Sequence, residues 1–197
     1  MMRRPAAMAA VCVLTAFSAG CASPQSHLYT LSAGAAAAGT AGESTSNLSV
    51  IVGPVSIPAI VDAPQIAVSV GPNQVHLDEF NRWASPLPNN IAHVVADNLV
   101  ALLGTPQVSL FPQTLNADAD FRVAIDVQTF QSAPGEAATL AAMWIVRRVK
   151  DGKTSTGRTM MREPTQGKGY DALVAAHSRA LARLSQDIAD AIRALTP

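Results

Sequence analysis

Seven residues near the C-terminal end of the chain recur at helical spacing, and this pattern constrains the fold more than any other in the sequence. They step by four, four, three, four, four and three positions: Leu173, His177, Leu181, Leu184, Ile188, Ile192 and Leu195. Such steps place side chains on one face of an α-helix, with charged residues such as Arg183 and Asp190 on the other faces. An apolar face of this length has to be covered. We therefore expect the helix to pack on a sheet or to present its stripe to a partner.

A second, shorter helical stripe begins after Pro86 and ends at Gly104 and Pro106, and the rest of the chain is rich in strand-like runs. The clearest run covers residues 120–131, where Phe121 and Val123 alternate with Arg122 and Ala124. Other runs cover residues 27–33, 48–58, 65–70, 74–77 and 107–111, and two further strands join at Asp151-Gly152. The order of these elements predicts an α+β fold, a mostly antiparallel or mixed sheet with two main helices packed on one face.

The N-terminus has the features of an export signal. Arg3 and Arg4 precede an apolar run of twelve residues from Ala6 to Phe17. A membrane-spanning helix needs about 20 apolar residues, whereas a secretory signal needs an apolar core of roughly 7 to 15 residues followed by small residues. The run therefore predicts export.

The small residues 18–20 stand directly before Cys21, and this arrangement resembles the signal of bacterial lipoproteins, in which the cysteine is acylated and becomes the mature N-terminus. Ser18 departs from the leucine usual at its position, and a plain signal peptide with an incidental cysteine is the alternative. By the same resemblance, Ala22 in place of aspartate favours the outer membrane. We predict a signal peptide at 1–20, a lipidated tether at 21–26 and a single domain at 27–197, with a flexible loop at 34–47.

Composition excludes several classes of function. Basic and acidic residues are equal in number, 14 of each, and form no basic cluster suited to nucleic acid. Cys12 lies within the signal, so the mature chain keeps one cysteine and can form no internal disulfide. The four histidines lack zinc-ligand spacing, and no G-x-S-x-G motif occurs. We predict no metal, no catalytic residue and no cofactor other than the diacylglyceryl and acyl groups, such as palmitate, on Cys21.

Trp83 is the one residue outside the N-terminus that suggests a binding role. It lies beside Arg82 in a predicted loop before the first helix, and a tryptophan in such a place can anchor an interface. It can equally fill the core beneath the loop. Arg82 and Trp83 are therefore a candidate partner interface, with a core role as the alternative.

Residues 52–87 and 170–192 together resemble the ABC-type transport auxiliary lipoproteins of the paraquat-inducible Pqi type. The most specific pieces are DAPQI at 62–66, Arg82-Trp83-Ala84 with Pro86-Leu87, and Leu184-Ser185 with Ile188-Ala189 in the last helix. The family more often carries arginine where Ala63 stands, so this chain departs from the family pattern in having no charge there.

The resemblance implies a non-enzymatic lipoprotein on the periplasmic face of the outer membrane. It would work with an inner-membrane-anchored MCE-domain protein, and with an ABC permease and ATPase or a Pqi-type membrane protein, in moving lipid between membranes. A lipid carrier that holds an acyl chain in an internal cavity and a periplasmic hydrolase are the alternatives. An exposed apolar patch over a solid core would favour docking. The oligomeric state stays open, including a homo-oligomer.

Overall fold

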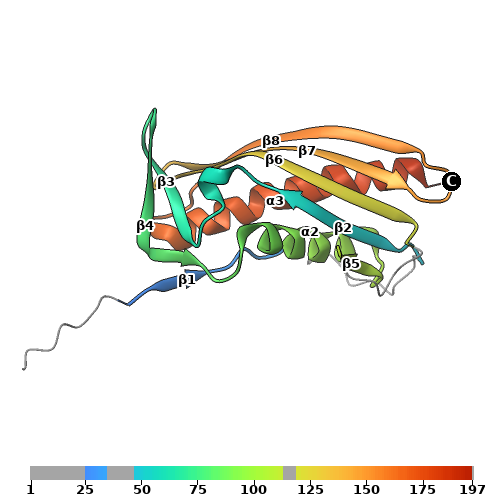
Figure 1. The fold of residues 1–197 in the computed structure, drawn as a ribbon, viewed down its shortest axis with the longest axis horizontal. Coiled ribbons are helices and arrows are strands. Elements are labelled where there is room, and N and C mark those ends of the chain that lie inside the picture. The colour runs from blue at the N-terminus through green and yellow to red at the C-terminus, as the bar shows by residue number, and fades with distance from the viewer. Residues whose placement is uncertain (1–24, 35–46, 113–118, 197) are drawn as a thin grey trace, which may run out of the picture.

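The computed structural model describes residues 25–34, 47–112 and 119–196. The signal peptide, Cys21 and most of the predicted flexible loop lie outside these residues. The described chain forms one α+β domain in which an open, mixed sheet of eight strands carries two long helices (Figure 1). This confirms the fold class predicted from the sequence. Neither helix is both long and apolar enough to cross a membrane.

The eight strands are β1 (His27–Tyr29), β2 (Val50–Ser56), β3 (Gln65–Gly71), β4 (Gln74–Trp83), β5 (Val108–Leu110), β6 (Phe121–Ala133), β7 (Ala137–Arg148) and β8 (Thr154–Pro164). Each of the eight strands lies at one of the predicted runs, although β1 and β4 end at other residues than predicted. A short 3-10 helix, η2 (Ala59–Val61), joins β2 to β3.

Strand β6 is the centre of the sheet. Its whole length pairs antiparallel with β7, which pairs antiparallel with β8. The other edge of β6 is shared by two parallel neighbours, β2 along its first half and β3 at Ser132. Beyond these, β5 pairs with β2, β4 with β3, and β1 with β4.

Both helices lie on one side of the sheet, as predicted. Helix α3 (Gly169–Leu195) packs against β6, β7 and β8, and α2 (Leu87–Leu103) packs against β2, β5 and α3. Gly104, in the left-handed conformation with φ 63°, ends α2 at the predicted position. The predicted stripe of α3 is buried from Leu173 to Ile192, with Leu181, Leu184 and Ile188 fully covered, and Leu195 at its end is partly buried. The helix therefore packs within the domain and does not present its apolar face to a partner.

Two predicted boundaries are wrong. Only residues 27–29 of the predicted strand 27–33 are a strand, because the amides after it are held by helix side chains: Leu31 N donates to Asn90 Oδ1 (3.3 Å) and Gly34 N to Asn98 Oδ1 (3.0 Å). Trp83 does not lie in a loop but is the last residue of β4, where it pairs with Tyr29 of β1. The sequence shows no such pairing because the two residues are far apart in the chain.

Candidate functional site

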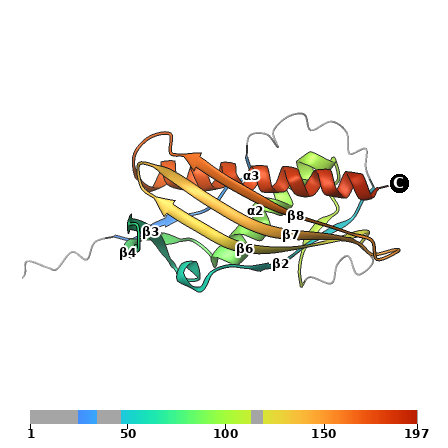
Figure 2. The same cartoon turned by 90° about the horizontal axis from the view of Figure 1, so that it is seen from above.

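The sheet face turned away from the helices is the main candidate for a functional site. Figure 2 shows β2, β6, β7 and β8 in front of α2, and none of the described helices covers this face. We call the part formed by these four strands the outer face. Along each of these strands, buried residues alternate with residues whose side chains point to the outer face.

Two rows of opposed residues cross the middle of the outer face. In the first, Ala124 of β6 lies opposite Ile145 of β7, which lies opposite Thr156 of β8. In the second, Asp126 lies opposite Met143, which lies opposite Arg158. The register alone brings these residues together, and each row joins three strands.

An apolar groove of about 330 Å³ lies along these rows. Its lining consists of Pro54, Val55, Ser56, Ala124, Ile125, Asp126, Met143, Trp144, Ile145 and Thr156. Met143 is 47% exposed and Ile145 39%, and Met160 beside them on β8 is 64% exposed. Large apolar side chains gathered on one face in this way mark a surface that another molecule covers.

Positive charge borders the groove. Arg122 of β6 and Arg147 of β7 lie directly opposite each other, a pairing of like charges that is unfavourable in isolation. Both are exposed, and neither makes an ion pair with any residue that the structure describes; the same holds for Arg158. Asp126 is engaged by Ser56, whose hydroxyl donates to Oδ1 at 2.6 Å. The border of the groove is thus suited to a partner that carries carboxylates.

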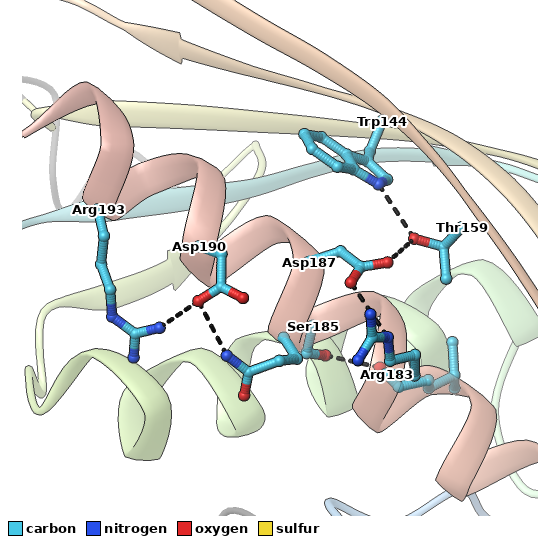
Figure 3. A network of polar contacts seen from close by, with 9 residues as sticks. Trp144, Thr159, Arg183, Ser185, Asp187, Asp190 and Arg193 are labelled. Carbon is cyan, nitrogen blue, oxygen red and sulfur yellow. Dashed lines mark hydrogen bonds and ion pairs between the residues drawn. The ribbon is translucent and has the colours of Figure 1, made fainter.

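The strands under the groove are fixed to α3 by a chain of polar contacts on the inner side of the sheet (Figure 3). Trp144 Nε1 donates to Thr159 Oγ1 (3.2 Å), and that hydroxyl donates to Asp187 Oδ2 (2.6 Å). Asp187 also forms an ion pair with Arg183 one helical turn earlier (3.2 Å). Thr159 is 3% exposed and the Arg183 side chain 58%, so this chain of contacts runs from the buried side of the sheet to the surface of α3. It holds β7 and β8, and with them the groove, in a defined position on the helix.

The other predicted residues lie at the far end of the domain from the groove's charged border. Trp83 is 6% exposed and packs edge-on against Phe130, with ring centroids 6.2 Å apart. Arg82 is half-buried, and its Nε donates to the carbonyl of Glu79 (3.0 Å). Both residues come later in the sequence than the DAP segment, residues 62–64. Trp83 and this segment, together with residues 84–87, line a hollow of about 320 Å³. A role of Arg82 and Trp83 at an interface stays a prediction.

A buried Ser–His pair is the nearest approach to catalytic chemistry in the described residues. Ser132 Oγ and His177 Nε2 are 2.8 Å apart, and the imidazole stacks on Phe130 with ring centroids 3.9 Å apart. Ser132 is 2% and His177 1% exposed, and His177 Nδ1 has no hydrogen-bond partner among the residues that the structure describes. Burial lowers the pKa of His177 to about 3, so the ring stays neutral. With no access for a substrate and no group that orients the ring, this pair is a core contact.

No group of three or more His, Cys, Asp or Glu side chains able to hold a metal ion occurs among the described residues. Sequence reasoning placed His177 on the apolar face of the last helix, and the structure agrees. It could not find the partner Ser132, which lies 45 positions earlier. The groove was also missed, since Met143 and Ile145 carry no motif.

Solved structures share the fold across nearly their whole length. A crystal structure of an uncharacterized protein has a TM-score of 0.68 at 20% identity and covers 86% of this chain and 99% of its own. A crystal structure of a Xanthomonas campestris protein of the DUF330 family has a TM-score of 0.65 at 19% identity, covering 86% of this chain and 97% of its own. At these identities the likeness concerns the fold alone. No curated protein matches the chain.

One family model matches residues 29–189, which is most of the described chain and includes the outer face, α2, all but the last six residues of α3 and the Arg82-Trp83 segment. The chain therefore belongs to the family of ABC-type transport auxiliary lipoprotein components.

Proposed function

We propose that this protein is a non-enzymatic docking component of an intermembrane lipid transport system, anchored by acyl groups on Cys21 to the periplasmic face of the outer membrane. Its partner is the periplasmic part of an MCE-domain protein that is anchored in the inner membrane, in a system that includes an ABC permease and ATPase. Family membership supports the transport role. The export signal and Cys21 support the place of attachment.

The outer face is the observation that carries the proposal. A groove lined by Met143 and Ile145 and bordered by the unpaired Arg122 and Arg147 lies on the side of the sheet that the described helices leave open. Strands under it are fixed to α3 through Thr159 and do not need to rearrange on binding. We propose that a partner segment with apolar side chains and flanking carboxylates covers this face.

Co-purification tests this proposal. The anchored protein is isolated from cells as wild type and as the double variant Met143→Glu/Ile145→Glu, and the amount of MCE-domain protein that accompanies it is measured. Two glutamates in the groove remove apolar contact and repel carboxylates, so we expect the partner to be lost. The matched control is Val100→Glu, since Val100 is 36% exposed on α2, on the opposite side of the domain. Equal recovery of the partner with the double variant and the control would contradict the proposal.

The groove also favours a second candidate, a carrier that holds an acyl chain itself. At about 330 Å³ the volume lies at the lower end of the range for small-molecule sites, roughly 300 to 1,000 Å³. The groove is open along the sheet, and an acyl chain in it would leave one side in water. Mass spectrometry of the purified mature protein distinguishes the two functions. A non-covalent lipid present in equal amount with the chain supports the carrier, and a chain free of such lipid that still captures its partner supports docking.

A further inference from the structure

The β3–β4 hairpin is a second concentration of exposed apolar residues, separate from the outer-face groove. Val70, Val75, Leu77 and Phe80 of the hairpin are 54%, 48%, 41% and 37% exposed, and Leu28 of the neighbouring β1 is 67% exposed. These are five of the twelve large apolar side chains that are exposed among the described residues. The turn between the strands, Gly71 to Gln74, carries no charged side chain.

The base of the hairpin is firmly attached to the domain. Tyr170, at the start of α3, donates its hydroxyl hydrogen to Asp78 Oδ2 at 2.5 Å, and Tyr29 of β1 donates to Asn81 Oδ1 at 3.0 Å. The two tyrosine rings are 5.8 Å apart. Asp78 Oδ1 also accepts the backbone N–H groups of Phe80 and Asn81. The turn therefore projects from the domain in a defined direction, as Figure 1 shows.

The same end of the domain carries the start of the described chain. Strand β1 pairs with β4 at His27 and Asn81, beside the hairpin, while the β7–β8 turn and the end of α3 lie at the opposite end (Figure 1). Five residues separate Cys21 from His27. Even fully extended, at roughly 3.6 Å per residue, the six steps from Cys21 to His27 span at most about 22 Å. An acyl group on Cys21 thus keeps the hairpin end of the domain close to the bilayer surface.

We infer that the β3–β4 hairpin is a membrane-contact element, which places Val70, Val75, Leu77 and Phe80 in the interfacial layer of the lipid bilayer to which Cys21 is anchored. This inference rests on the acylation of Cys21 in the proposed function. The tether supplies attachment, and the hairpin supplies a second point of contact that sets how the domain stands on the membrane. Because the hairpin runs across the long axis of the domain (Figure 1), contact along its length would leave the β7–β8 turn farthest from the lipid surface.

The contact can be measured with a fluorophore whose emission depends on polarity. It is attached to Asn73→Cys in the hairpin turn and, as the matched control, to Lys150→Cys in the β7–β8 turn at the opposite end. The acylated mature protein is reconstituted into vesicles of phosphatidylethanolamine and phosphatidylglycerol that contain a bilayer-resident quencher. We expect a blue-shifted, quenched emission from position 73 and unchanged emission from position 150. Equal emission from the two positions on vesicles that carry the protein would overturn the inference.

A second attachment separates the hairpin from the anchor. The mature chain with Cys21→Ser and an N-terminal histidine tag is bound to vesicles that contain a nickel-chelating lipid, so that the domain is held at the surface without acylation. Position 73 should again be quenched, whether or not the native protein proves to be acylated at Cys21. Failure of acylation would remove the proposed anchor, whereas failure of quenching on nickel vesicles would remove the hairpin contact.

Variants of the hairpin complete the test. The double variant Val75→Ser/Leu77→Ser is compared with the wild type as untagged, unacylated mature chains on vesicles of phosphatidylethanolamine and phosphatidylglycerol. Its partition onto the vesicles should be about tenfold weaker, because two apolar side chains no longer leave water. Met160→Ser, which changes a side chain 64% exposed on the outer face, should leave partition unchanged. Protection of position 73 only after the transport partner is added, and not on vesicles alone, would assign the hairpin to a protein interface and overturn the membrane contact.

Discussion

Trp144 of β7 lies directly opposite Gly157 of β8, and its indole ring occupies the space in which a Cβ atom at position 157 would stand. The absence of a side chain at Gly157 therefore lets the ring lie flat across the neighbouring strand. The indole N–H then reaches Thr159 two residues further along β8. This contact joins β8 to β7, which carries the exposed Met143 and Ile145 on its other face.

Gly157→Ala should destabilise the fold by about 1–3 kcal/mol, because the added methyl group forces Trp144 out of its position. The free energy of unfolding, measured by urea denaturation, tests this expectation. Gly71→Ala is the matched control, since a Cβ there would meet its nearest neighbour at 3.7 Å, an ordinary contact. Equal stability of the Gly157 variant and the control would show that the ring is not constrained by the glycine.

Thr159→Val should cost about 1–2 kcal/mol of stability, because it leaves Trp144 Nε1 and Asp187 Oδ2 without their shared partner in a partly buried region. The volume of the side chain hardly changes, so the loss reports the hydrogen bonds. Thr156→Val on the exposed outer face provides the control and should be close to neutral. Thermal unfolding of both variants measures the difference.

The stability of the wild-type protein should fall as the pH drops from about 6.5 toward 3. Burial lowers the pKa of His177 to about 3 in the folded state, while the unfolded chain has the ordinary value near 6.5. Between these values the unfolded state binds the additional proton, so each pH unit should remove up to about 1.4 kcal/mol of stability.

His177→Gln should flatten this dependence between pH 7 and pH 5, because a neutral amide replaces the titrating ring beside Ser132. Asp78, whose pKa is lowered to about 2, does not titrate in this range: its burial acts to raise the pKa, but hydrogen bonds from Tyr170, Asn81 and Phe80 outweigh it. An unchanged slope in the His177 variant would contradict the assignment.

Arg147→Thr should stabilise the isolated protein by about 0.2–1 kcal/mol and at the same time weaken partner capture. The gain follows from removing the like-charge pair with Arg122 across β6 and β7. The loss of capture follows if the pair serves a carboxylate-bearing partner, and it should be largest at low salt. Unfolding and co-purification of the same variant measure the two effects. A variant that is less stable, or that captures the partner as well as the wild type at low salt, would contradict this role of the pair.

The helices and the central strand could be predicted from the sequence because their signals are local. The stripe of α3 and the alternation from Phe121 to Val127 follow from periodicity, and each lies within one element. The groove depends instead on how β7 aligns with β6 and β8. Nothing in the sequence specifies that Met143 stands between Asp126 and Arg158, since register is decided by the packed sheet.

The end of strand β4 in the hairpin could not be predicted from the sequence either. Residues 74–77 have the pattern of a strand, but β4 continues to Trp83 because β1 pairs with it and Asp78 accepts two backbone amides across the irregular stretch. The contacts between β1 and β4 join residues about 50 positions apart, and the contacts of Asp78 depend on a single carboxylate. Neither kind of contact leaves a periodic signal in the sequence.

Site-specific photo-crosslinking from the outer face in living cells tests the docking role most directly. A photoreactive amino acid replaces Met143 in the full-length chain, and Val100 on α2 carries the same group as the control. After irradiation, we predict a covalent adduct from position 143 whose second component is identified by mass spectrometry as an MCE-domain protein, and none from position 100. If position 143 yields no adduct, or the same adduct as position 100, the outer face is not the docking surface.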